Sequence, residues 1–183
     1  MERTVKDLNI LEKFATQFCR VVDAHAKYMI VSGFVAIISG RIRGTEDIDL
    51  IIEPLDAQTF SKLHHDLCTH GFEAIQSSSP DVLLEYLTDK TSIQYCWLDK
   101  PLPVMELKFA KDDLDRMQLH ERVRLPLTTL DLWFSSIEWN IAFKEEYLQS
   151  EKDMDDAHHL RKIYTVDEQK IKEYKVLVRR YRL

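Results

Sequence analysis

The stretch YMIVSGFVAIISGRIRGTEDIDLII, residues 28–52, decides the fold that we predict for this chain. It opens with an apolar segment, turns at Ser32 and Gly33, and closes with a second apolar segment that carries Asp47 and Asp49. Three of the four glycines in the 183 residues lie within it. Because glycine permits sharp turns and close approach of the backbone, this concentration indicates a tight turn or a ligand contact in the region.

The periodicity of apolar residues outside this stretch predicts a mixed sheet with flanking helices, followed by helices alone. The predicted strands cover residues 28–31, 47–52, 72–76, 91–98 and 104–109, with Pro101 and Pro103 breaking the chain before the last. The predicted helices cover residues 5–26, 34–39, 57–70, 135–149, 151–163 and 167–183. This order predicts the α+β class, with an α/β domain over residues 1–125 and a C-terminal helical extension, residues 126–183, packed on it.

Composition narrows the class of protein. Hydrophobic residues make up 45% of the chain and charged residues 31%, which is typical of a soluble globular protein. No apolar stretch approaches the roughly 20 residues of a membrane span, and the three widely spaced cysteines favour a cytoplasmic protein. A net charge of −6 argues against non-specific nucleic-acid binding. The basic segment 170–182 is either a solvated helix face, which we favour, or a contact surface for RNA phosphates.

Asp47 and Asp49 form the chemical core of the interpretation. Residues two apart on a strand point to the same face, so the two carboxylates are expected to lie side by side. Like charges this close are costly without a cation, and hard oxygen ligands suit Mg²⁺. The bland alternative is an edge strand with a solvated acidic face.

Residues 28–52 resemble the signature of the nucleotidyltransferase superfamily, whose prototype is DNA polymerase β. That signature is an apolar strand, a glycine-rich turn and an Asp-apolar-Asp pair. The run from Gly40 to Asp49 is similar to the small prokaryotic branch, which includes minimal nucleotidyltransferases and the nucleotidyltransferase toxins of abortive-infection systems. Residues 137–144 and 152–157 resemble two further motifs of that branch. The resemblance implies the nucleotidyltransferase fold.

The resemblance also implies a set of site residues. Asp47, Asp49 and a third acid would be catalytic and would hold Mg²⁺ or Mn²⁺. Glu106 is the best candidate for the third acid, and Asp99 is the second candidate. The family usually has Asp, not Glu, at the position that Glu106 would occupy. The remaining residues that the resemblance assigns to nucleotide binding are Ser32, Gly33, Arg43, Thr45, Lys144 and Asp156.

Several of these residues have ordinary structural alternatives. Glu106 could pair with Lys108 or face solvent, and Lys144 could be a surface lysine paired with Glu145 or Glu146. Arg41 and Arg43 could bridge triphosphate oxygens, because guanidinium groups suit them, or remain solvated in their loop. Thr45 could simply hydrogen-bond within its turn.

The resemblance implies an enzyme that moves a nucleotidyl group from a nucleoside triphosphate to a hydroxyl of RNA, protein or a small molecule. The alternative is a catalytically weak or inactive member that binds a partner protein, as in a toxin–antitoxin pair. Glutamate at the third acid position motivates that alternative. A metal-dependent phosphoesterase that uses the same acids is a third possibility. No interaction with a membrane is expected.

Overall fold

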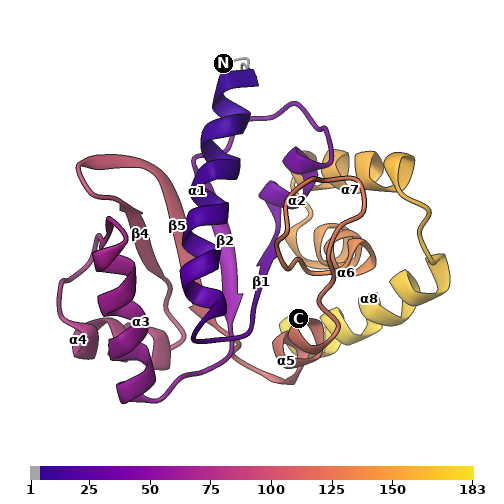
Figure 1. Cartoon of the computed structure of the whole chain (residues 1–183). Helices are drawn as coiled ribbons and strands as arrows, with labels where there is room; N and C mark the ends of the chain where they lie inside the picture. Colours follow the sequence, from indigo (N-terminus) through magenta and orange to yellow (C-terminus); the bar gives the residue numbers. More distant parts are fainter. Residues whose placement is uncertain (1–4) are drawn as a thin grey trace.

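The computed structural model describes residues 5–183, and a five-stranded mixed sheet forms its centre (Figure 1). The strand order is β1-β2-β5-β4-β3, in which β2 and β5 are parallel and all other neighbours are antiparallel. The strands are β1 (Tyr28–Val31), β2 (Asp47–Ile52), β3 (Phe72–Ala74), β4 (Ile93–Trp97) and β5 (Lys100–Phe109).

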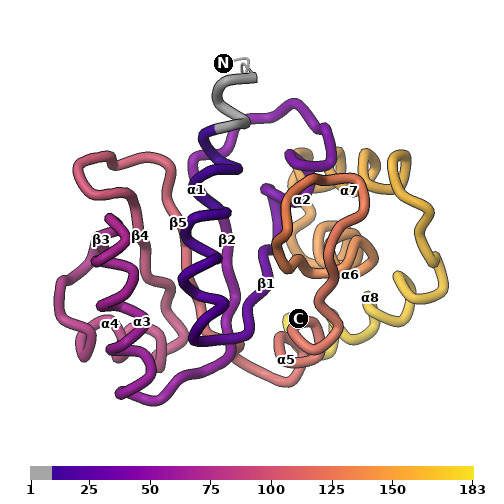
Figure 2. Tube along the Cα trace, viewed as in Figure 1, coloured from indigo at the N-terminus to yellow at the C-terminus, as the bar shows by residue number. Residues whose placement is uncertain are grey.

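Helices cover the sheet and extend beyond one edge. Figure 2 shows α1 running across the sheet, with α3 and α4 beside β3 and β4, and with the C-terminal helices gathered beyond β1. None of the described helices combines the length and apolar composition that crossing a membrane requires. The helices are α1 (Val5–Asp23), α2 (Gly33–Ile38), α3 (Ala57–Thr69), α4 (Pro80–Thr88), α5 (Asp113–His120), α6 (Ile137–Phe143), α7 (Glu151–Ile163) and α8 (Glu168–Arg182), with a π-helical turn, η1 (Lys144–Leu148), directly after α6.

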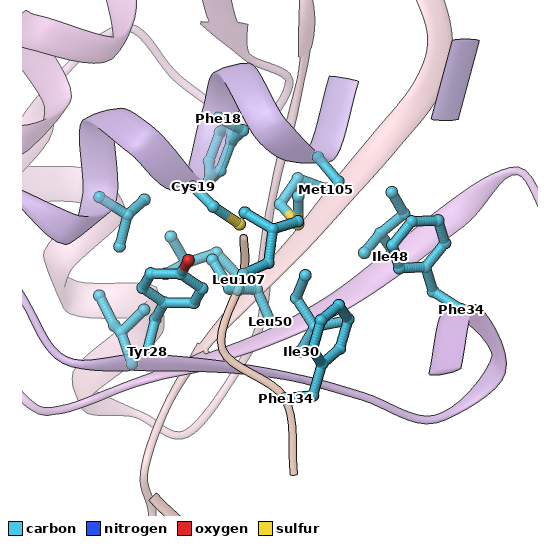
Figure 3. Close-up of a cluster of buried hydrophobic side chains, with 14 of the residues drawn as sticks. Phe18, Cys19, Tyr28, Ile30, Phe34, Ile48, Leu50, Met105, Leu107 and Phe134 are labelled. Carbon is cyan, nitrogen blue, oxygen red and sulfur yellow. The ribbon is translucent and has the colours of Figure 1, made fainter. Parts of the chain in front are cut away.

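Side-chain alternation along β2 separates the core from the candidate site. Ile48, Leu50 and Ile52 are fully buried on the face that packs against α1, together with Phe18 from that helix (Figure 3). Because neighbouring residues on a strand point to opposite faces, Asp47 and Asp49 project from the other face. The same core cluster continues into the C-terminal part of the chain through Phe134, Ile141, Ala157 and Leu160.

Two helices were not predicted. Ser79 and Pro80 begin α4 in the arrangement in which proline occupies the first helical turn, where its missing N–H costs nothing. Asp112 caps α5 by accepting a hydrogen bond from the backbone N–H of Asp115 at 3.0 Å. Both helices are short, so each shows only a brief apolar periodicity. The residues at their N-termini are then the main indication in the sequence that a helix begins.

The prediction that Pro101 and Pro103 break the chain before the last strand is wrong, since both lie inside β5. The strand tolerates them because pairing with β2 starts only at Val104. Pairing with β4 is irregular at the same place, passing from Cys96–Val104 to Trp97–Lys100. The prolines therefore occupy positions at which a missing N–H removes no regular ladder bond.

The single helix predicted over residues 135–149 is α6 followed by the π-helical turn η1. Gln149 ends the turn in the left-handed conformation, and Ser150 then caps α7 by accepting from the N–H of Asp153 at 3.1 Å. This confirms the predicted start of the helix at residue 151. A single π turn of this kind is frequent at functional positions.

The basic segment at the C-terminus is not simply solvated. Lys175 and Arg179 of α8 pair with Glu145 and Glu146 of η1 at 2.6 and 2.9 Å. Arg182 is only 5% exposed in its side chain and contacts Asp115 of α5 at 2.5 Å. These ion pairs hold α8 against the helices that precede it.

Candidate active site

The pairing of β2 with β5 brings two predicted acids together. Asp49 lies directly opposite Glu106 in this parallel pair, and Asp47 lies opposite Val104. Residues opposite each other in a strand pair share a face of the sheet, so Asp49 and Glu106 project side by side. The edge-strand alternative for the acid pair is wrong, because β2 lies between β1 and β5.

An ammonium group lies between these two carboxylates. Lys108 Nζ is 2.8 Å from Glu106 Oε1 and 3.1 Å from Asp49 Oδ1. The alternative in which Glu106 pairs with Lys108 is therefore the arrangement in the structure. Burial raises the pKa of Asp49, and the neighbouring ammonium only partly offsets that effect. Although burial disfavours the ammonium of Lys108, the two carboxylates raise its pKa above the ordinary value.

The other candidate for the third acid lies outside this pair. Asp99 occupies the turn between β4 and β5 at φ 61°, and its backbone N–H points to Glu73 Oε1 at 3.4 Å. Glu106, by contrast, shares the face of the sheet that Asp49 occupies. The geometry thus favours Glu106 over Asp99 as the partner of the acid pair.

Asp47 is exposed at the start of β2 and is held by its own turn. Thr45 Oγ1 lies 2.7 Å from Asp47 Oδ1 and 3.0 Å from the Asp47 carbonyl oxygen. Among the described residues, no group of three or more His, Cys, Asp or Glu side chains is arranged so that it could hold a metal ion. The oxygen donors are nevertheless of the type that Mg²⁺ prefers, and the Lys108 ammonium between two of them is a stand-in cation.

The Ser32-Gly33 turn leads from β1 into α2 and is built around two close contacts. The backbone N–H of Ser32 donates to Asn140 Oδ1 of α6 at 3.1 Å. A Cβ on Gly33 would lie 2.8 Å from a terminal nitrogen of Arg43, so a larger residue here would require that guanidinium to shift. The close approach that the glycine was expected to permit is therefore, in this structure, the approach of Arg43.

The backbone of Ser32 has φ 65° and ψ −132°, a conformation that residues other than glycine rarely adopt. Such a conformation costs about 1–3 kcal/mol, whereas glycine adds about 0.5–1 kcal/mol of unfolded-state entropy. We expect Ser32→Gly to raise the free energy of unfolding by about 1 kcal/mol in urea titrations. Ser32→Ala, which keeps the Cβ, is the control and should not stabilise the protein. Equal changes in the free energy of unfolding for Ser32→Gly and Ser32→Ala would contradict the inference that the backbone of Ser32 is strained.

A second ion cluster joins the loop after α2 to the C-terminal helices, and we call it the Asp156 cluster (Arg41, Arg43, Lys144, Asp153, Asp155 and Asp156). Asp156 is fully buried and accepts from Arg41 Nε at 2.7 Å, from Lys144 Nζ at 2.9 Å and from Arg43. Lys144 also contacts Asp153 at 3.1 Å.

These contacts bear on three predicted nucleotide-binding residues, Arg43, Lys144 and Asp156, which the fold brings together. The surface alternative for Lys144 is wrong, since its side chain is 1% exposed and its partners are on α7. The Nε atom of Arg43 is buried without a hydrogen-bond partner. A direct role of the three residues in nucleotide binding stays a prediction.

A pocket of about 350 Å³ opens between the acidic face of the sheet and the C-terminal helices. Asp49, Lys108 and Ser32 line one side of it. Sequence reasoning missed most of the opposite wall, although Asn140 lies one helical turn before Lys144 and so shares its face. The residues of that wall include Trp139, Asn140, Phe143, Lys144 and Tyr147 of α6 and η1, and Lys111, Asp115, Gln118 and Arg182 also line the pocket.

Comparison with known proteins identifies the fold. No family model matches the chain, and no curated protein matches it in sequence. An antigenic nucleotidyltransferase-like protein from Paracoccidioides brasiliensis aligns over 99% of this chain and 91% of its own, with a TM-score of 0.59 and 17% identity. The antibiotic-resistance factor ANT(2'')-Ia aligns over 94% and 92%, with a TM-score of 0.58 and 11% identity. The α+β prediction is confirmed, and the chain has the fold of nucleotidyltransferase-like proteins.

Proposed function

We propose that the protein is a nucleotidyltransferase that moves a nucleotidyl group from a nucleoside triphosphate to a hydroxyl group. The observation that carries the proposal is the placement of Asp49 directly opposite Glu106 in the paired strands, with Asp49 lining a pocket that Ser32 also lines. Pockets of this size suit small ligands, and perturbed carboxyl groups in a pocket are typical of catalytic sites.

The proposed reaction is a displacement at the α-phosphorus. The acceptor oxygen forms a bond to that phosphorus, the bond to the bridging oxygen breaks, and diphosphate leaves. The proton of the acceptor hydroxyl passes to a carboxylate, for which the raised pKa suits Asp49. The aromatic side chains of Phe143 and Tyr147 on the opposite wall provide surfaces on which a base can stack.

Mg²⁺ or Mn²⁺ is proposed as the cofactor, with Asp47, Asp49 and Glu106 as its protein ligands. When bound, the ion would supply positive charge to the phosphate oxygens. Lys108 has to leave the two carboxylates before they are free to act as ligands. The acceptor is proposed to be RNA, a protein or a small molecule.

A second candidate function is supported by the same ion pair. If Lys108 remains bound to Asp49 and Glu106, the chain itself occupies the position between the acids and offsets part of their charge. The protein would then be a catalytically weak or inactive member of the fold that acts by binding a partner protein, as in a toxin–antitoxin pair. Nucleotide binding and transfer distinguish the two candidates.

The test is to incubate the protein with each of the four nucleoside triphosphates labelled at the α-phosphate, with and without Mg²⁺, and to measure binding and label transfer. We expect Mg²⁺-dependent binding of at least one nucleotide and transfer of label to the protein or to added RNA. Both should be lost in the double variant Asp47→Ala/Asp49→Ala. Failure of the wild-type protein to bind any nucleotide would overturn the proposal and leave the partner-binding candidate.

A further inference from the structure

The strongest unexplained feature of the site is that its acids already hold a cation that belongs to the chain. Lys108 is on the same strand as Glu106, two residues further on, and therefore on the same face. Its ammonium contacts an oxygen of Glu106 at 2.8 Å and an oxygen of Asp49 at 3.1 Å. One positive group thus bridges the two carboxylates that come from different strands.

This bridge explains how two acids are tolerated side by side at paired positions of neighbouring strands. Carboxylates at directly opposed positions repel each other, and the side chains of Asp49 and Glu106 are only 26% and 21% exposed. Solvent therefore screens them incompletely, and the repulsion is relieved either by a cation between them or by protonation of one carboxylate. Lys108 meets this need without any bound ion.

We propose that Lys108 occupies the cation position shared by Asp49 and Glu106, so that a divalent metal ion binds there only by displacing its ammonium. The inference rests on the proposed function in one respect, since it takes a divalent ion as the natural ligand of these acids. It adds a regulatory property, because the chain itself competes with the metal for the site.

The surroundings of Lys108 permit this exchange. Its side chain is 41% exposed and lines the pocket, so the ammonium has solvent and open space beside it. A lysine side chain also has a flexible four-carbon stem. Its ammonium is a mobile point charge, unlike the rigid, planar guanidinium of arginine. The ammonium can therefore leave the carboxylates without a rearrangement of the sheet.

The test is to titrate Mn²⁺ into the full chain without nucleotide and to measure free Mn²⁺ by electron paramagnetic resonance. Lys108→Met, which keeps the length and apolar stem of the side chain, is expected to bind Mn²⁺ at least tenfold more tightly than the wild-type protein. Lys111→Met is the matched control, since Lys111 lines the same pocket and has no ion pair among the described contacts. It should change the affinity less than threefold.

The higher Mn²⁺ affinity of Lys108→Met must depend on Asp49 and Glu106. Adding Glu106→Gln to Lys108→Met should remove it, and a gain that survives this change would place the ion elsewhere and overturn the inference. An affinity of Lys108→Met equal to or weaker than that of the wild type would overturn it as well. Thermal unfolding supplies a second readout, because Mn²⁺ should raise the melting temperature of Lys108→Met more than that of the wild type.

These outcomes are separate from those that test the proposed function. Tighter Mn²⁺ binding by Lys108→Met, in a protein that transfers no nucleotide, would support the competition and reject the enzyme. Nucleotide transfer by the wild type with no effect of Lys108→Met on Mn²⁺ affinity would support the enzyme and reject the competition.

Discussion

Replacing Asp49 with asparagine is expected to lower the rate of nucleotidyl transfer by about 100-fold or more, the usual effect of removing a catalytic acid or base. Asp49 lies opposite Glu106, lines the pocket and has a raised pKa caused by burial. Asparagine has the same shape but carries no charge, so it removes the proton acceptor and one proposed metal ligand. The measurement is the initial rate of label transfer from the nucleotide that the wild-type protein uses.

The matched control is Asp99→Asn. The sequence offers both acids as site candidates, but Asp99 lies at the turn between β4 and β5, outside the acid pair. Its replacement is expected to leave the rate within about twofold of the wild type, since the β4–β5 turn lies beyond Lys100, away from the paired positions of Asp49 and Glu106. Melting temperatures of both variants check that the fold is retained. Full transfer activity in a folded Asp49→Asn protein would remove Asp49 from the mechanism.

The features that sequence predicted well are those carried by local patterns. An apolar strand, a turn at Ser32 and Gly33, and an alternating strand with Asp47 and Asp49 are each visible within a few residues, and all are present. Alternation along β2 also decides which face carries the acids, because its period of two leaves no choice once Ile48 and Leu50 are buried.

The features that sequence did not predict depend on contacts between distant segments. Glu106 was a candidate from its place within a strand, but its position opposite Asp49 is a matter of register between β2 and β5. Its pairing with Lys108 was only one of two ordinary alternatives, because a strand pattern does not specify what lies between two side chains. The short helices α4 and α5 were missed because each offers little more than a cap.

The Asp156 cluster is the clearest case of a non-local arrangement. Arg41 and Arg43 precede Asp156 by 115 and 113 residues, and nothing near any of the three in sequence indicates the contact. The resemblance placed Arg43, Lys144 and Asp156 near a nucleotide, and the structure places them in contact with one another. Asp156 therefore has a structural role that can be measured without any ligand.

Replacing Asp156 with alanine is expected to lower the free energy of unfolding by about 3–5 kcal/mol, the usual cost of removing one partner from a buried ion pair. The carboxylate is fully buried and accepts from three cationic side chains, of which Lys144 is itself only 1% exposed. Its loss leaves buried positive charge with too few partners. Urea titration measures the change, provided that the slope of the unfolding free energy against urea concentration is the same in the wild type and the variant.

Asp155→Ala is the control, because Asp155 is the neighbouring acid of the same helix and contacts the same Arg41 at 3.0 Å. Its side chain is 62% exposed, and exposed ion pairs contribute at most about 1 kcal/mol. Asp156→Ala is therefore expected to lower the free energy of unfolding far more than Asp155→Ala does, because only Asp156 is buried. A loss below about 1 kcal/mol for Asp156→Ala would show that the three cations find other partners or solvent.

The same pair of variants tests whether the Asp156 cluster positions the loop that leads to the acids. Arg41 and Arg43 are in the segment between α2 and β2, and this segment also contains Thr45, whose hydroxyl contacts the Asp47 carboxylate. If Asp156 fixes the segment, amide exchange over residues 40–46 should become faster in Asp156→Ala and stay unchanged in Asp155→Ala. Faster exchange confined to α7 would mean that Asp156 stabilises its own helix and has no influence on the acids of β2.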